Sequence, residues 1–249
     1  MSMSALDIPV EHEAREAEMT SRELEHEQRR TLETDPMKYS LISRLLFLPI
    51  DLLYGRKGDL RKFHVLEVVA RVPYQAWESV GYVAITHAHA APGFAKRVFD
   101  FVIESRRQQD NEQWHLLVLE EMIRKRELKK GFLRYRLIPQ LLAFGHYHLS
   151  WLLYAMKPRW SYRLNAEFED HAEREYMKFV EANPELAAEP WETELCREYG
   201  NYATIGDVLR RIAVDEREHK EESLLRLDAP RFGLEPGKLV RPSRLRVQE

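Results

Sequence analysis

Two short stretches, Glu112–His115 (EQWH) and Glu216–His219 (EREH), decide how this sequence folds. Residues three apart on a helix lie on nearly the same face, so each stretch presents a carboxylate and an imidazole to one point. Two such pairs, with one inward glutamate from each of two other helices, form the ligand set of a two-metal carboxylate bundle. Glu67 precedes the first pair and Glu169 lies between the pairs, so the order along the chain matches that set.

The candidate ligands fall on the inward faces of separate predicted helices. The pairs continue otherwise apolar stripes on helices predicted at about 92–130 and 202–227, and the lone glutamates lie on helices at about 60–86, kinked at Pro73, and 161–182. An unpaired carboxylate on a buried stripe would cost stability, so a metal is the better explanation. Carboxylate and imidazole donors suit two bridged iron ions. The predicted ligands are Glu67, Glu112, His115, Glu169, Glu216 and His219.

Three residues beside these ligands are candidates for supporting roles. Asp215 and Asn111 each precede a ligand and could fix an imidazole by a hydrogen bond. Tyr176 follows Glu169 by two helical turns, where it could deliver an electron and a proton to an oxygen intermediate. The same position would equally suit a plain buried tyrosine, and the pattern alone leaves both interpretations open.

Composition narrows the class of protein. The 249 residues suffice for one core, and the 38 basic and 41 acidic residues nearly cancel, which argues against a nucleic-acid partner. The single cysteine, Cys196, excludes an intramolecular disulfide and any multi-cysteine metal site. We expect a charged N-terminal arm at 1–36, solvated or disordered and without a secretory signal, a bundle domain at 37–228 and a tail at 229–249. A third pair, Glu23–His26 (ELEH), lies among charges and is not expected to bind metal.

Two apolar segments lie outside the ligand-bearing helices. Residues 132–156 are the most hydrophobic part of the chain, but arginines, histidines and a proline interrupt them before they could form a membrane span. This segment reads either as a helix lying in a membrane interface or as a buried crossover helix. Residues 39–50 read either as a strap covering the core or as a segment lying on a membrane surface.

Four motifs resemble those of the alternative oxidases, in particular their plastid terminal oxidase branch. They are Leu66–Tyr74 (LEVVARVPY), Asn111–Leu116 (NEQWHL), Phe168–Ala172 (FEDHA) leading to Tyr176, and Asp215–His219 (DEREH). The similarity extends from about residue 61 to 225, and the motifs occur in the order found in the family. The resemblance implies an all-α fold, a ferritin-like four-helix bundle with a di-iron carboxylate core and membrane-associated amphipathic helices. It also implies a homodimeric, monotopic enzyme that oxidises quinol and reduces dioxygen to water without pumping protons.

The resemblance also assigns roles to residues. The six predicted ligands would hold the two irons, Tyr176 would be the redox-active tyrosine, and Asp215 and Asn111 would support the ligands. The quinol head group would approach Glu67 near Leu66 and Ala172. The membrane surface would come from the helix carrying Glu67 and from residues 132–156, and a bacterial member would lie on the cytoplasmic face of a thylakoid or plasma membrane.

Some residues depart from the relatives. Lys62 and Glu175, near the quinone pocket, differ from the mitochondrial branch, so plastoquinol and ubiquinol both remain candidate substrates. No cysteine precedes Cys196, so thiol control of the mitochondrial kind is not expected. Two other functions fit the same motifs. One is a soluble ferritin-like di-iron oxygenase or oxidase with another substrate, and the other is a non-enzymatic helical scaffold on a membrane surface.

Overall fold

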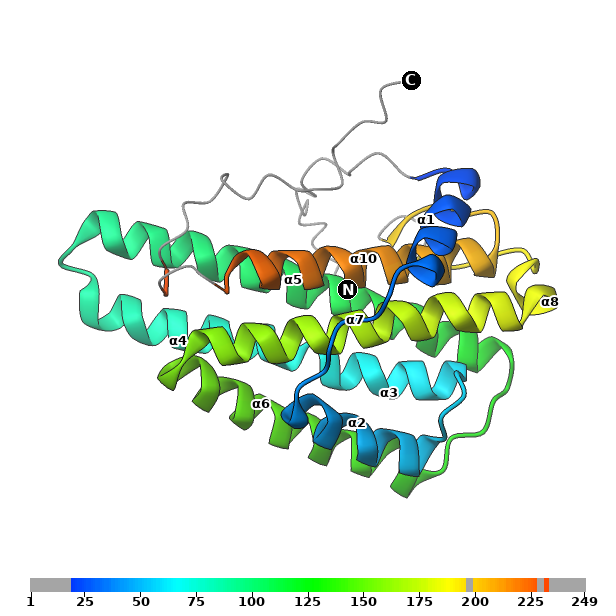
Figure 1. The fold of residues 1–249 in the computed structure, drawn as a ribbon, viewed down its shortest axis with the longest axis horizontal. Helices are drawn as coiled ribbons and strands as arrows, with labels where there is room; N and C mark the ends of the chain where they lie inside the picture. Colours follow the sequence, from blue (N-terminus) through cyan, green and yellow to red (C-terminus); the bar gives the residue numbers. More distant parts are fainter. Residues whose placement is uncertain (1–18, 196–198, 228–230, 233–249) are drawn as a thin grey trace, which may run out of the picture.

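The computed structural model describes residues 19–195, 199–227 and 231–232, and the described part is built of helices (Figure 1). The ranges of its helices are α1 Ser21–Glu33, α2 Leu41–Tyr54, α3 Leu60–Ala70, α4 Val72–Ala88, α5 Pro92–Lys125, α6 Ile138–Met156, α7 Pro158–Ala182, α8 Pro184–Ala187 and α10 Ile205–Leu225, with a π-helical turn at Leu133–Leu137. The predicted all-α class is confirmed. Cys196, residues 1–18 of the arm and all but two residues of the 229–249 tail lie outside the described residues.

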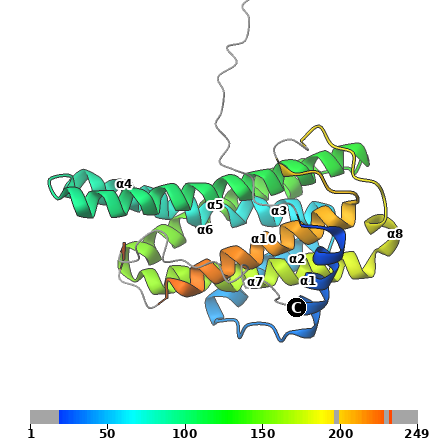
Figure 2. The same ribbon diagram turned by 90° about the horizontal axis from the view of Figure 1, so that it is seen from above.

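Four helical rods enclose the core: α3 continued by α4, then α5, α7 and α10. Helices α7 and α10 pack along each other, and α4 packs along α5, with the α4–α5 pair extending beyond the rest at one end (Figure 2). The rod expected to kink at Pro73 is divided at Arg71, and Pro73 lies in the first turn of α4, where its missing N–H costs no hydrogen bond. Thr204 caps α10 by accepting a hydrogen bond from the Asp207 N–H.

Helix α1 lies across α7 and α10, although its sequence is mostly charged (Figure 1). Leu24 is fully buried beneath it, and the Arg217 guanidinium of α10 binds both Glu27 of α1 and Glu173 of α7. This part of the expected solvated arm is therefore a packed helix, because its charges pair with buried charges of the bundle. Glu23 and His26 are exposed on its outer side.

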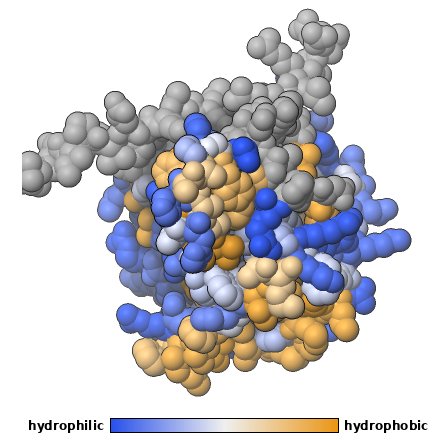
Figure 3. Space-filling model, turned by 90° about the vertical axis from the view of Figure 1, so that its left-hand side faces the viewer, coloured by the Kyte–Doolittle hydropathy of each residue, from blue (hydrophilic) through white to orange (hydrophobic). Residues whose placement is uncertain are grey.

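Exposed apolar side chains gather on α2 and α6, both of which lie along the lower side of the bundle in Figure 1. Figure 3 shows an apolar band along this lower edge. The members are Leu41, Ile42, Leu45, Leu48 and Leu52 of α2 and Leu141, Phe144, Trp151, Leu152 and Met156 of α6.

The helix predicted at 60–86, which carries Glu67, was expected to contribute to the membrane surface, and that expectation stays a prediction. Its first part, α3, is buried along nearly its whole length and packs against α5, α6 and α7, whereas Tyr82 and Val83 of its second part, α4, are exposed. Within the described ranges, no helix is both long and apolar enough to cross a bilayer.

Candidate metal centre

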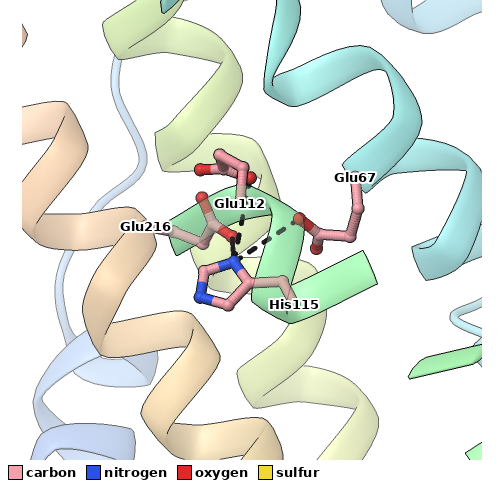
Figure 4. Close-up of side chains that lie close together, drawn as sticks. All are labelled: Glu67, Glu112, His115 and Glu216. Atoms are coloured by element: carbon pink, nitrogen blue, oxygen red, sulfur yellow. Dashed lines mark ion pairs between the residues drawn. The ribbon is translucent and has the colours of Figure 1, made fainter. Parts of the chain in front are cut away.

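The six predicted ligands converge in the middle of the bundle. Glu67 comes from α3, Glu112 and His115 from α5, Glu169 from α7, and Glu216 and His219 from α10. Figure 4 shows three carboxylates pointing at the His115 ring. All six side chains are buried, and His219 is the most exposed of them at 6%. The helix pattern placed them correctly, because each lies on the stripe that faces the other three rods.

The ligands form two overlapping groups. One contains Glu67, Glu112, His115 and Glu216, and the other contains Glu112, Glu169, Glu216 and His219; within each group the ligand atoms lie within 4.8 Å of one another. The two groups share Glu112 and Glu216. Each shared carboxylate turns one oxygen to each histidine: Glu112 places Oε2 3.7 Å from His115 Nδ1 and Oε1 2.7 Å from His219 Nδ1. The arrangement suits two metal ions bridged by Glu112 and Glu216.

Eight donor atoms of this cluster are buried without a hydrogen-bond partner. They divide into two sets of four. The first set is Glu67 Oε2, Glu112 Oε2, His115 Nδ1 and Glu216 Oε1; the second is Glu112 Oε1, Glu169 Oε2, Glu216 Oε2 and His219 Nδ1. Buried polar atoms in native proteins are nearly always paired, so this concentration needs a missing partner. Two cations, each with four protein donors, satisfy all eight atoms.

The pKa shifts of the cluster also indicate that its carboxylates need cations. Burial and the neighbouring Glu216 carboxylate raise the pKa of Glu67 and of Glu169 well above the ordinary value. Burial also acts to raise the pKa of Glu112, but the adjacent imidazoles of His115 and His219 outweigh it and lower that pKa. Without cations Glu67 and Glu169 therefore resist ionising beside the other carboxylates. Divalent cations would remove that repulsion.

The lone carboxylates are each held by a tyrosine. Tyr176 of α7 donates its phenolic hydrogen bond to Glu67 Oε1, and its ring stacks on Phe63 with centroids 4.2 Å apart. Tyr74 of α4 donates to Glu169 Oε1 at 2.8 Å. Burial and the adjacent Glu67 raise the Tyr176 pKa well above its usual value, so the phenol holds its proton. The sequence singled out Tyr176 and gave Tyr74 no role beyond its place at the end of the Leu66–Tyr74 motif.

The structure brings Asp215 to a ligand but does not bring Asn111 to one. Asp215 Oδ2 lies 3.2 Å from His115 Nε2 and also accepts a hydrogen bond from Tyr199. The Arg211 guanidinium binds the other oxygen of Asp215. Asn111 has a buried Oδ1 with no hydrogen-bond partner among the described residues. Tyr199 was missed from the sequence, because it precedes α10 in a segment without helical periodicity.

Residues near the expected quinol approach are buried. Leu66 and Ala172 are at most 2% exposed, on α3 and α7. Lys62 lies one turn before Leu66, and its buried ammonium donates to Asp51 Oδ1 at 2.9 Å and lies 3.8 Å from Glu175 Oε2. Lys62 and Glu175 directly precede Phe63 and Tyr176 in the sequence, and the rings of Phe63 and Tyr176 are stacked.

Comparison with known proteins agrees with this geometry. A family model described as "Alternative oxidase" matches residues 14–224. The chain is also similar to "Ubiquinol oxidase 4, chloroplastic/chromoplastic" of Arabidopsis thaliana, with 31% identity over 136 residues. That match covers 55% of this chain and 35% of the plant protein, so it spans about a third of the relative's length. The helical bundle, the paired carboxylate–histidine sites and the match over most of the chain agree, and the chain belongs to the alternative oxidase family.

Proposed function

We propose that this protein is a di-iron quinol:oxygen oxidoreductase that oxidises plastoquinol or ubiquinol and reduces dioxygen to water. The observation that carries the proposal is the set of eight buried donor atoms, four for each of two cations, shared through two bridging carboxylates. Membership of the alternative oxidase family and the similarity to a chloroplast ubiquinol oxidase support the substrate. Two irons held by these residues would supply electrons to dioxygen in pairs.

The residues around the centre have distinct tasks in this mechanism. Asp215 fixes the His115 ring by holding Nε2, which leaves Nδ1 free to bind metal. Glu67 and Glu169 each keep one oxygen for a metal while the other accepts a tyrosine hydrogen bond. The Tyr176 hydroxyl is hydrogen-bonded to Glu67. From there it can pass a hydrogen atom from quinol towards the centre, because the phenol keeps its proton at neutral pH.

The quinol head group would bind near Leu66, Ala172 and Glu67. The buried ammonium of Lys62 offers a hydrogen bond to a quinol oxygen, and the carboxylates of Asp51 and Glu175 hold that ammonium in place. Because the electrons and protons of quinol enter the same buried site, its oxidation moves no proton across a membrane.

We infer a peripheral, monotopic attachment to the cytoplasmic face of a thylakoid or plasma membrane. The apolar band of α2 and α6 provides the contact area, and basic side chains lie at both ends of the α6 region: Arg134 and Arg136 at one end, Lys157 and Arg159 at the other. Flotation with liposomes tests this attachment. Recovery of Leu45→Glu/Phe144→Glu protein with the liposomes at the wild-type level would contradict it. We also propose a homodimer, to be tested by sedimentation in detergent.

Oxygen uptake tests the function. Iron-loaded protein is supplied with plastoquinol or ubiquinol analogues in the presence of cyanide, with Glu216→Ala as the control that removes a bridging ligand. The proposal predicts cyanide-insensitive uptake that requires quinol and is abolished in the variant. Uptake that is absent from a fully iron-loaded wild type with both quinols would refute it, and flotation without quinol oxidation would favour the scaffold function.

A further inference from the structure

The two lone glutamates and their tyrosines form a reciprocal pair of motifs. Tyr74 follows Glu67 by seven residues, just as Tyr176 follows Glu169. Each tyrosine donates its hydrogen bond to the glutamate of the other motif: Tyr176 to Glu67, and Tyr74 to Glu169. Glu67 belongs to one metal group and Glu169 to the other. Each metal position therefore has its own buried tyrosine, in contact with the ligand that only this position uses.

The environment of Tyr74 matches that of a hydrogen-atom donor. Its side chain is fully buried, and its ring lies edge-on to the His219 imidazole with centroids 5.5 Å apart. Asn165 Nδ2 donates to the Tyr74 oxygen at 3.0 Å and also to Ser223 Oγ. Because Asn165 occupies the acceptor side of the oxygen, the phenolic proton is directed at Glu169 Oε1, 2.8 Å away. A carboxylate in that position can take the proton as the ring loses an electron.

We propose that Tyr74 is a second redox tyrosine, which serves the metal position of Glu169 as Tyr176 serves that of Glu67. The inference rests on the proposed di-iron occupancy and on dioxygen as the oxidant. Reduction of dioxygen to two waters takes four electrons and four protons. Two ferrous ions that become ferric supply two electrons. Tyr74 and Tyr176 supply one electron and one proton each as their O–H bonds break, and two further protons come from solvent.

Two quinols then restore the site. One returns a hydrogen atom to each tyrosyl radical, and the other returns one electron to each iron and releases the two protons taken from solvent. The sum is two quinols and one dioxygen converted to two quinones and two waters. With both tyrosines, the site stores all four electrons before dioxygen arrives. With one tyrosine it is one electron short, so partly reduced oxygen would escape.

The test counts radicals, independently of turnover. Anaerobic ferrous protein carrying ring-deuterated tyrosine is mixed with dioxygen in the absence of quinol, frozen within milliseconds and examined by electron paramagnetic resonance. We expect two phenoxyl radicals per iron pair in the wild type, one in Tyr74→Phe, one in Tyr176→Phe, and more hydrogen peroxide released by each variant. Tyr147→Phe is the matched control: this phenol donates to Ser79 of a neighbouring helix, away from any ligand, so both radicals should remain.

Two results would overturn the proposal: no radical in Tyr176→Phe, or an undiminished count in Tyr74→Phe. If Tyr74→Phe does not fold, Tyr176→Phe still decides, because it must keep one radical if Tyr74 is a donor. Failure of this inference is distinct from failure of the proposed function. Quinol oxidation with a radical only on Tyr176 would remove the role of Tyr74, whereas two radicals without any quinol oxidation would contradict the quinol assignment.

Discussion

Two buried glutamates on α7, one turn apart, should respond in opposite ways to the same substitution. Glu169 belongs to the metal centre, where its Oε2 has no hydrogen-bond partner and lies among other carboxylates. Glu173 is equally buried, but both of its oxygens are paired: Oε1 with Thr31 and the Arg217 guanidinium, and Oε2 with the Lys220 ammonium. Glutamine keeps the shape of each side chain and removes its charge.

The magnitudes follow from these partners. Burial and Glu216 raise the Glu169 pKa, so a neutral amide resembles the metal-free state; the free energy of unfolding of metal-free Glu169→Gln should stay within about 1 kcal/mol of the wild type. Glu173→Gln removes one of the two carboxylates that pair with Arg217 and with Lys220, and that should cost about 1.5 to 3 kcal/mol. With metal present, Glu169→Gln should be less stable than the wild type. At a free metal concentration of about 100 Kd, the loss of one site removes about 2.7 kcal/mol of stabilisation.

Urea unfolding of both variants, with chelator and with excess manganese(II), measures these differences, and elemental analysis counts the bound metal. Glu169→Gln should unfold like the wild type in chelator, gain less from metal and hold about one ion fewer per chain. Glu173→Gln should be destabilised in both conditions and keep its metal count. A Glu169→Gln chain that loses several kcal/mol in chelator would show a structural carboxylate and refute the reasoning.

Three further predictions concern other positions. Burial lowers the pKa of His146 to about 4, so the folded protein favours the neutral imidazole and loses stability as pH falls from 6.5 towards 4. At pH 5 the free energy of unfolding should be about 2 kcal/mol smaller than at neutral pH. In urea unfolding of the metal-free protein, His146→Phe should not show this loss. Asp215→Asn should weaken metal binding about 10- to 100-fold, because His115 loses its orienting partner; a chelator competition that gives the wild-type affinity would contradict this. Gly206→Ala would place a Cβ 2.8 Å from the Ala187 carbonyl oxygen, so the free energy of unfolding should fall by about 1 to 3 kcal/mol in thermal unfolding. An unchanged melting temperature would show that α8 shifts without cost and would contradict this prediction.

The sequence predicted which side chains converge in the candidate metal centre, because the signals that mark them are local. The three-residue spacing in each pair and the apolar stripe around it are properties of one helix at a time. Tyr176 was noticed for the same reason, since its spacing from Glu169 places it on the same face. The break near Pro73 likewise follows from the chemistry of one residue.

The failures depend on contacts between distant segments. Helix α1 reads as a solvated arm because its charges are visible, whereas their buried partners, Glu173 and Arg217, lie far along the chain. The burial of α3 depends on its packing against α5, α6 and α7, which no pattern within its own residues reveals. Tyr199 reaches Asp215 from a segment without periodicity, so spacing rules could not select it.

The central claim is a centre of two metal ions that share Glu112 and Glu216. An anaerobic titration of the metal-free chain with ferrous iron, followed through chelator-competed binding, tests it most directly. The structure predicts saturation at two irons per chain in the wild type and loss of both in a Glu112→Ala/Glu216→Ala double variant, because both bridging ligands are gone. Saturation at a single iron, or two irons still bound by the double variant, would contradict the claim.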